Sequence, residues 1–475
     1  MKKINLFIGA VTATVAAHAA VVEEVVVRQQ WPWSTDVKVE YKLADVTSPV
    51  DLKVRVFDGE TEIAADKVAK ALKGDVYGIS EGGVGSFFID PLVACGADRD
   101  AVPDFKVRVE TVASADNINE VLYKIVSLVD GSVTNVRRAD FYNGRYGAYE
   151  ESFAYVGETS LSDVFIWTSV TNDVKYKTTH MVFRKIPVAG QEILVGKTSG
   201  QYRVKLSHDY WMAVFEATQD QFNRLYSNHG EWGHHNGVSN PDFAATRPAE
   251  TIKWQFVRGT TKGFQWGKDV ELATAREVDS GTAVYNFRQI TGNDLIDIPT
   301  AAQWEIACRA GTTAALYSGK ACPAEYNCSK NADLAVLARY GFNGGLTTAD
   351  WQTKIAEKGY AYYTAEQIAA FDLSRGTMPV GSYLPNAYGL YDMLGNVGEL
   401  VLDVATASYT AGELYVDPMG GAAVTAPTSR SIYFCGGSWG SLAYNNGTTA
   451  FAKQRVGHDW TNDPTMGVRF CINEE

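Results

Sequence analysis

The chain has 475 residues, of which 46% are hydrophobic and 21% are charged. This composition is that of a folded globular protein and excludes an intrinsically disordered one, while the length predicts two or three domains. With 55 acidic and 43 basic residues, the formal net charge is −12 at pH 7, which argues against nucleic acid or an anionic membrane as the binding partner.

The first residues are organised like a bacterial secretory signal. Lys2 and Lys3 precede an apolar stretch that begins at Ile4, and the small-residue sequence Ala-His-Ala follows at 17–19. We expect residues 1–19 to be a signal peptide and the protein to be secreted, periplasmic or at the cell surface. No later stretch is long and apolar enough to predict a transmembrane segment.

Residues 20–170 show the alternation of apolar and charged side chains that is typical of half-buried strands. Four runs carry this pattern, at 37–41, 52–57, 105–109 and 123–129. Asp-Gly turn sequences follow the second and the fourth run. Several short strands over this length predict an all-β, immunoglobulin-like sandwich. The region has no catalytic constellation, so we expect it to serve as a spacer or docking domain.

Residues 171–475 have a different character, rich in Trp, Gly and loops, and only two helices are clearly indicated. Thr218 with Gln221, and Thr300 with Gln303, have the spacing of capping boxes, in which both side chains satisfy free backbone groups of a first helical turn. Short amphipathic helices should therefore begin at these threonines. The rest predicts an irregular α+β domain.

Four sequence motifs in this region resemble one known family. They are YWMAVFEATQ at 210–219, IPTAAQWE at 298–305, PNAYGLYDMLGNV at 385–397, and GGSW at 436–439 with GVR at 467–469. In this order they resemble the formylglycine-generating enzymes, or sulfatase-modifying factors. The resemblance implies a C-type-lectin-like fold, shared with non-heme iron enzymes and variable ligand-binding proteins.

The resemblance also implies where catalysis would occur. In catalytic members, two cysteines downstream of the GGS motif bind copper and activate oxygen to oxidise a substrate cysteine. These positions correspond to Ser441 and Asn446, and neither side chain can replace a thiolate for Cu(I). Cys435 precedes the motif and fills neither position. We therefore expect no copper and no catalytic residues.

A calcium site is implied by the loop at 392–399. Its ligands would be the carboxylates of Asp392 and Glu399 and the backbone carbonyls of Gly395 and Val397, a donor set that suits Ca²⁺. The alternative is that Asp392 caps a turn and Glu399 is a solvated charge.

A second calcium site in the family would correspond here to Asn331, the carbonyl of Ala332, and Asp372. Ser374 would offer its carbonyl where the family has an aromatic residue, and the intervening stretch is longer than in the enzymes. Glu216 would approach this site as an additional oxygen ligand, and the alternative is an exposed Glu at a strand end. His229, Glu231, His234 and His235 form a separate cluster, with the alternatives of a metal site or a solvated, glycine-rich loop.

None of the six cysteines forms a CxxC pair, which argues against a zinc knuckle or a thioredoxin-like site, and disulfides are the default in an oxidising compartment. The resemblance implies a bridge between Cys308 and Cys471, although Cys471 lies one residue later than in the family pattern. Since one step along a strand turns a side chain to the other face, the bridge would need a bulge. Cys322 and Cys328 are close enough in sequence to pair with each other.

Substrate recognition in the family implies a ligand-binding segment between residues 439 and 462. Its flat aromatic and amide-bearing side chains suit peptides or sugars, and the alternative is a polar loop with some buried Trp. The candidate ligand-binding residues are Trp439, Ser441, Tyr444, Asn445, Asn446, Arg455, His458 and Trp460.

The leading hypothesis is an exported, non-catalytic protein that binds a protein or glycan through a calcium-stabilised, lectin-like domain. The alternative is a metal-dependent oxidoreductase of the same family that modifies a protein or thiol. A third possibility is a purely structural surface protein.

Overall fold

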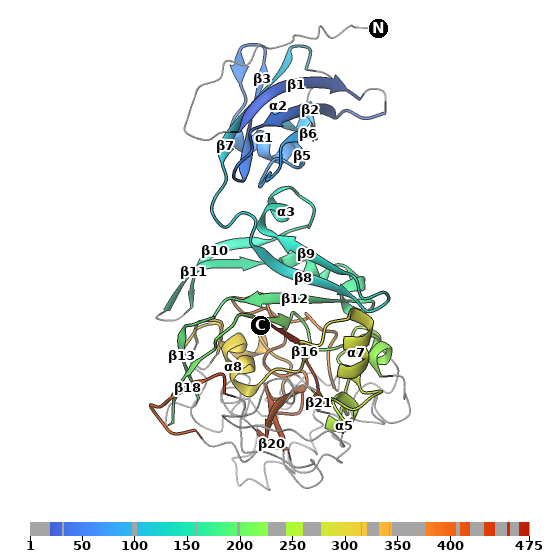
Figure 1. Cartoon of the computed structure of the whole chain (residues 1–475), viewed down its shortest axis with the longest axis vertical. Helices are drawn as coiled ribbons and strands as arrows, with labels where there is room; N and C mark the ends of the chain where they lie inside the picture. Colours follow the sequence, from blue (N-terminus) through green and yellow to red (C-terminus); the bar gives the residue numbers. More distant parts are fainter. Residues whose placement is uncertain are drawn as a thin grey trace, which may run out of the picture. The chain divides into compact units, whose positions relative to one another are not determined.

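A computed structural model of the chain describes residues 20–30, 33–96, 102–156, 159–196, 200–226, 244–259, 277–314, 316–320, 332–341, 343, 376–404, 409–418, 432–441, 454–456 and 465–474. The structure divides into two compact units. One comprises the chain up to residue 122 together with 136–147, and the other comprises 123–135 and 148–475 (Figure 1). The second unit thus includes strands that precede residue 171, where the motif-rich region was expected to begin.

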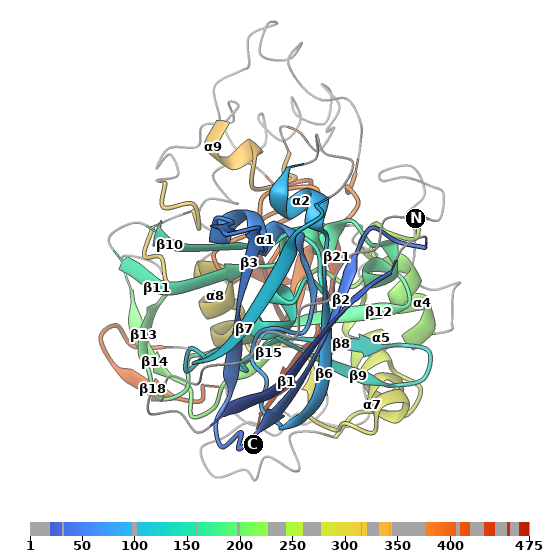
Figure 2. The ribbon, with the colours of Figure 1, turned by 90° about the horizontal axis from the view of Figure 1, so that it is seen from above.

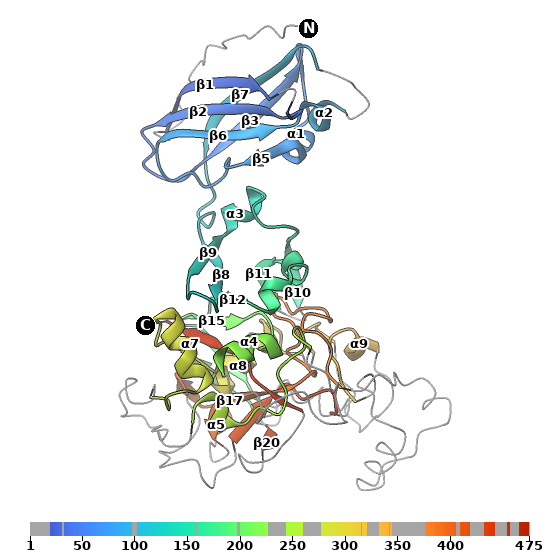
Figure 3. The same cartoon turned by 90° about the vertical axis from the view of Figure 1, so that its right-hand side faces the viewer.

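The described residues of the first unit form two sheets and three short helices (Figure 3). One sheet has the order β1-β2-β6-β5 and the other the order β4-β3-β7. Its elements are β1 (Val21–Gln29), β2 (Val37–Ala44), β3 (Val50–Asp58), β4 (Thr61–Glu62), α1 (Ala65–Ala71), β5 (Leu72–Gly74), β6 (Gly83–Ile89), α2 (Pro91–Cys95) and β7 (Phe105–Ala113). The unit ends with α3 (Arg138–Tyr142).

The alternating sequences predicted here do form strands. Buried and less buried residues alternate along β2, and Val39, Val56, Phe87 and Val109, one from each of four strands, share a single core. Because successive side chains of a strand point to opposite faces, apolar residues at every second position bury one face of each sheet. The Asp-Gly sequence after β3 turns the chain into β4, with Gly59 at a φ of 64°.

The second unit is organised around a six-stranded sheet of order β16-β22-β15-β12-β8-β9 (Figure 2). The strands are β8 (Val121–Ser127), β9 (Val133–Arg137), β12 (His180–Ile186), β15 (Tyr210–Ala213), β16 (Ile296–Asp297) and β22 (Cys471–Asn473). The neighbouring strands β15 and β22 are about 260 residues apart in sequence, so the sheet places residues 471–473 beside residues 210–212.

Both predicted capping boxes are present. Helix α4 (Gln219–Leu225) begins after Thr218, whose hydroxyl accepts a hydrogen bond from Gln221 N at 3.2 Å while the Gln221 side chain accepts one from Thr218 N at 3.1 Å. Helix α8 (Ala301–Arg309) begins after Thr300 with the same exchange with Gln303, at 3.1 and 3.0 Å. Local sequence alone is enough to start a helix in this way.

The remaining described elements are short. They are β10 (Glu150–Val156), β11 (Thr159–Ile166), η1 (Thr168–Thr171), η2 (Val174–Lys177), β13 (Glu192–Val195), β14 (Tyr202–Lys205), α5 (Trp254–Val257), α7 (Ala283–Thr291), α9 (Ala332–Ala335), β17 (Gly398–Val404), β18 (Leu414–Val416), β19 (Ile432–Cys435), β20 (Gln454–Val456) and β21 (Met466–Gly467). The chain is therefore a sheet-rich α+β protein, as predicted. No helix in the described ranges is long and apolar enough to cross a membrane.

Candidate functional site

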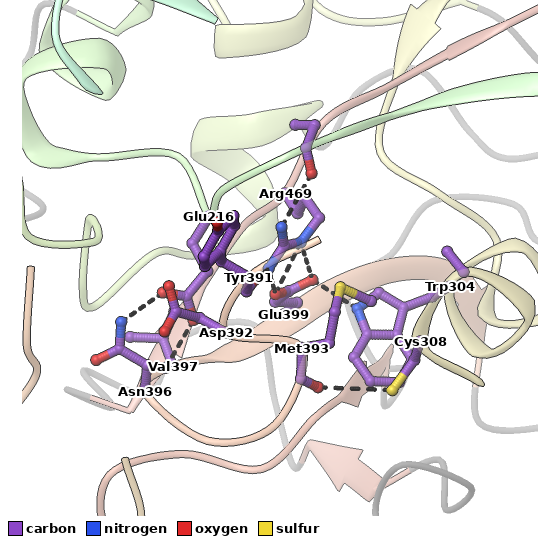
Figure 4. A network of polar contacts seen from close by, with 12 residues as sticks. Glu216, Trp304, Cys308, Tyr391, Asp392, Met393, Asn396, Val397, Glu399 and Arg469 are labelled. Atoms are coloured by element: carbon purple, nitrogen blue, oxygen red, sulfur yellow. Dashed lines mark hydrogen bonds and ion pairs between the residues drawn. The ribbon is translucent and has the colours of Figure 1, made fainter. Parts of the chain in front are cut away.

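Three carboxylates and one guanidinium meet in the interior of the second unit (Figure 4). Glu216 lies between β15 and α4, Asp392 in the loop before β17, Glu399 within β17, and Arg469 between β21 and β22. Each has a relative exposure of 1% or less. These four residues are called the acid cluster below; three of the four sequence motifs supply Glu216, Asp392 and Arg469, and Glu399 follows the third motif by two residues.

Arg469 and Glu399 form a buried ion pair. The Arg469 Nη2 lies 2.6 Å from Glu399 Oε1, and Nε lies 2.9 Å from Oε2. The indole of Trp304 donates to Oε2 at 2.5 Å. Arg469 also donates to three backbone carbonyls, those of residues 213, 214 and 391, at 2.8–3.0 Å. Glu399 is therefore not the solvated charge of the alternative interpretation, and both of its oxygens are engaged by protein donors.

Glu216 holds the loop that leads into β17. Its Oε2 accepts a hydrogen bond from Asn396 Nδ2 at 2.6 Å and its Oε1 one from Val397 N at 3.0 Å. Asn396 has a φ of 57°, in the left-handed region. Burial, followed by the charges of Asp392 and Glu399, raises the pKa of Glu216 well above its usual range.

Within the described ranges, one carboxylate oxygen of Asp392 accepts a hydrogen bond and the other does not. Its Oδ2 accepts a hydrogen bond from Gly381 N at 2.6 Å, whereas its buried Oδ1 has no hydrogen-bond partner among the described residues. Burial raises the pKa of Asp392 to about 6, against the lowering effect of the Gly381 amide. Because the bond to Gly381 reaches back eleven residues, Asp392 does not simply cap its own turn.

The acid cluster has more negative than positive charge. Its three carboxylates share the guanidinium of Arg469, and Lys177 adds a weaker electrostatic effect on Asp392. An uncompensated buried carboxylate is unfavourable unless it is protonated or meets a cation. Together with the unpartnered Asp392 oxygen, this excess fits a cation bound beside Asp392. Among the described residues, no three Asp, Glu, His or Cys side chains are placed to hold a metal, so a cation here would also need backbone carbonyl ligands.

Of Asn331, Ala332 and Asp372, which were predicted for the second calcium site, the structure describes Ala332 alone. Ala332 opens α9 and is exposed, while Asn331 and Asp372 lie outside the described residues. The histidine cluster at 229–235 also lies outside them.

Trp439 does not have the surface position expected of a ligand-binding residue. Its side chain is 2% exposed and belongs to the same core as Trp304 and Met393, while its backbone N donates to the Asn396 carbonyl at 2.8 Å. This burial matches the alternative given for the segment, a polar loop with some buried Trp, because a large apolar ring gains free energy when it is removed from water.

Ser441, at the first expected copper-ligand position, takes part in a hydrogen-bonded turn. Its hydroxyl accepts a hydrogen bond from Ser438 N at 2.9 Å and lies 3.3 Å from the Ser438 hydroxyl. Its carbonyl accepts one from Gly341 N at 2.6 Å. Arg455 is described only in its backbone, within β20. Tyr444, Asn445, Asn446, His458 and Trp460 lie outside the described residues.

Cys308 and Cys471 are free and buried in the structure, which differs from the bridge that the resemblance implied. Cys308 Sγ lies 3.8 Å from the Met393 carbonyl oxygen, whereas Cys471 pairs across the sheet with Met212 and Asp297. The one-residue offset of Cys471 is a physical reason for the difference, because β22 has no bulge against β15 that would turn the side chain back. Burial raises the pKa of both thiols.

Sequence reasoning did not assign Glu216 and Arg469 to this site. Arg469 was visible only as the last letter of the closing GVR motif, and Glu216 was considered only as an additional ligand of the second calcium site. A charged residue inside an otherwise apolar segment is the signal that could have identified Glu216, because such a residue needs buried partners.

Residues 171–474 match the family model described as the sulfatase-modifying factor enzyme 1-like domain. The chain is similar to the formylglycine-generating enzyme of Bos taurus, with 27% identity over 148 residues, covering 30% of this chain and 29% of the bovine protein. It is 30% identical to the formylglycine-generating enzyme of Thermomonospora curvata over 142 residues, covering 29% of this chain and 38% of that protein. The chain thus spans well under two-thirds of the length of these curated relatives.

The chain is also similar to solved structures. Treponema denticola variable protein 1 aligns with 20% identity and a TM-score of 0.40, covering 62% of this chain and 96% of that one. PvdO from Pseudomonas aeruginosa aligns with 15% identity and a TM-score of 0.40, covering 62% of this chain and 94% of that one.

Proposed function

The chain belongs to the sulfatase-modifying factor family, and from this membership we propose that it is an exported, non-catalytic member that binds a protein or glycan ligand. The observation that carries the proposal is Ser441. A hydroxyl stands where the resemblance requires a copper-binding thiolate, and it is already hydrogen-bonded to Ser438. The second position, Asn446, is an amide, so neither position offers the soft ligand that Cu(I) needs.

The three buried cysteines among the described residues do not offer a substitute. Cys308, Cys435 and Cys471 all belong to the core of the second unit. Burial raises the pKa of Cys308 and Cys471, which disfavours the thiolate that would bind a metal or react with oxygen.

A copper titration tests the non-catalytic proposal. The wild-type chain should not retain Cu(I) against a competing chelator and should not oxidise a cysteine-containing peptide. The double variant Ser441→Cys/Asn446→Cys should gain copper binding, whereas Ser382→Cys with Asn446→Cys, which adds the same number of thiols, should not. Copper retention with peptide turnover by the wild type would overturn the proposal.

The proposal extends to the fold of each unit. For the first, the sheet orders β1-β2-β6-β5 and β4-β3-β7 around one core support an immunoglobulin-like sandwich. For the second, family membership supports a C-type-lectin-like fold. An experimental structure of the full chain would decide both assignments by strand order.

Calcium is the cofactor that the acid cluster supports. Asp392 would hold it with the carbonyls of Gly395 and Val397, because the buried Asp392 Oδ1 lacks a partner. Glu399 fits less well as a ligand, since Arg469 and Trp304 engage both of its oxygens. Bound calcium would supply positive charge and fix the loop before β17.

The ligand would contact the segment between residues 439 and 462. Because Trp439 is in the core, recognition would fall to residues after it, of which Tyr444 and Asn446 are the first to test. Glycans and secreted proteins from the source of this chain should bind the wild type and lose affinity by about 1 kcal/mol or more with Tyr444→Ala. Unchanged binding by Tyr444→Ala and Asn446→Ala would move the site elsewhere.

Export itself is tested by the fate of the first residues. The proposal expects the chain recovered from its source to begin at Ala20, as N-terminal sequencing would show. An N-terminus at Met1 in a chain recovered from the cell interior would contradict export without bearing on the binding function.

A further inference from the structure

A cavity of about 250 Å³ lies in the second unit, away from the acid cluster. Its lining comes from β8, β9, β16 and β22 and from the end of helix α7; β8, β9 and α7 are labelled in Figure 2. Its apolar lining comes from Val126, Val133, Ile296 and Ile472. On the polar side the lining includes Lys124 and Asn135.

The cavity follows from where helix α7 ends. Phe287 of this helix packs against Phe183 and Phe470, with ring centroids 6.3 and 5.5 Å apart. One turn later the helix stops at Gly292, which has a φ of 66°. Beyond this point, the cross-strand pair Ile296 and Ile472 lines the cavity.

Lys124 is a half-buried cation on this face. Its Nζ lies 4.2 Å from the centroid of the Trp211 ring, a cation–π contact. In the described part of the chain, no hydrogen bond or ion pair to this Nζ is found. The carboxylate of Glu474 is engaged by the Trp211 indole at 2.6 Å, and the neighbouring Lys185 pairs with Asp209 at 3.1 Å.

An ammonium group has three hydrogen-bond donors, and a half-buried one is favoured by an acceptor. Burial lowers the pKa of Lys124, against the raising effect of Glu474, while Lys185 lowers it further. A bound anion would reverse this lowering. The cavity thus combines an apolar surface with a cation that has no acceptor of its own in the described residues.

We propose that this cavity binds a small organic carboxylate, with its anionic end on Lys124 and its hydrocarbon part against Val126, Val133, Ile296 and Ile472. Asn135 would supply a further polar contact at the rim. The volume is below the roughly 300–1,000 Å³ of pockets that take drug-sized ligands, so a chain of a few carbons is the class expected. This site is independent of the proposed function and does not share its residues.

Butyrate is the probe, titrated into the full chain and followed by ligand-observed NMR. It should bind saturably, while butyramide, which has the same shape without the charge, should bind about tenfold more weakly or worse. Lys124→Met should weaken butyrate by a similar factor. Lys205→Met, a lysine on β14 outside the cavity, should leave binding unchanged and serves as the matched control.

A second variant tests the cavity without touching the charge. Val133 is 50% exposed on the edge strand β9, so Val133→Phe should fold normally and fill part of the space. It should reduce butyrate binding with an unchanged melting temperature. The absence of saturable butyrate binding by the wild type, or equal binding of butyrate and butyramide, would overturn the proposal.

Discussion

At the scale of single residues, Arg469 has the largest number of specific contacts in the acid cluster. It is fully buried and donates to Glu399 and to three backbone carbonyls from two separate segments. A guanidinium suits this position because its donors have a fixed planar arrangement that matches a carboxylate and several carbonyls at once. Lysine, with a single ammonium, could not reach all of these acceptors.

We therefore predict that Arg469→Met destabilises the protein by about 3–5 kcal/mol, because it leaves Glu399 buried without its cation. Denaturant unfolding of the full chain measures the effect. Arg203→Met breaks an exposed pair with Glu192 and should change stability by no more than about 1 kcal/mol. In the double variant Arg469→Met/Glu399→Leu, the loss should be well below the sum of the single losses, and strict additivity would contradict the coupling.

Tyr41 provides a pH-dependent prediction in the first unit. Burial, together with Asp75, raises the pKa of Tyr41 to about 12. Because the folded-state pKa of Tyr41 lies above its unfolded-state value, the stability contributed by the neutral side chain is fully present below about pH 10. It is lost as the pH rises from about 10 through about 12. Tyr41→Phe removes this loss. The free energy of unfolding of the variant, relative to that of the wild type, should rise by about 1 kcal/mol as the pH is raised from about 8 to about 11. Urea unfolding at a series of pH values measures this difference. Parallel pH profiles would contradict the assignment.

At the scale of elements, the β8–β9 hairpin and helix α7 are fitted together at Gly131. This residue has a φ of 74°, and a Cβ there would overlap the carbonyl oxygen of Ile290 in the last turn of α7. The Asp-Gly turn thus does two things: it permits the left-handed conformation, and it allows the helix end to approach closely.

Gly131→Ala should destabilise the protein by more than the cost of placing alanine at a positive φ. Gly190 has the same φ of 74°, and no atom lies within 4 Å of a Cβ added there. Gly190→Ala therefore measures the cost of the positive φ alone, about 1–2 kcal/mol. The overlap with Ile290 should add about 1–3 kcal/mol for Gly131→Ala. Both are measured by thermal unfolding. Equal losses would mean that the helix end moves aside freely.

At the scale of the whole molecule, the two compact units should unfold in separable transitions, so that calorimetry of the full chain can assign an effect to one unit. The proposed calcium binds the second unit alone. Because the unfolded chain cannot assemble the site, calcium at about a hundred times its dissociation constant should stabilise that unit by about 2.7 kcal/mol.

Chelation should accordingly lower one melting transition and leave the other in place. Asp392→Ala should abolish this sensitivity, whereas Asp220→Ala, which removes the carboxylate of a helix-surface ion pair, should retain it. If the chelator moves neither transition of the wild type, the excess charge of the acid cluster is balanced by protons and the calcium assignment is wrong.

Strands β2, β3, β7 and β8 and the starts of α4 and α8 were predicted from the sequence alone, because a period of two and a Thr-x-x-Gln spacing act between residues close in the chain. The motifs likewise identified the family. Only the tertiary structure decided that Glu399 pairs with Arg469, that Trp439 is buried, and that Asp392 has an unpartnered oxygen. The Glu399–Arg469 pair joins residues 70 positions apart in the sequence. Whether a charge or a ring is buried depends on what the folded chain packs around it, which no local pattern specifies.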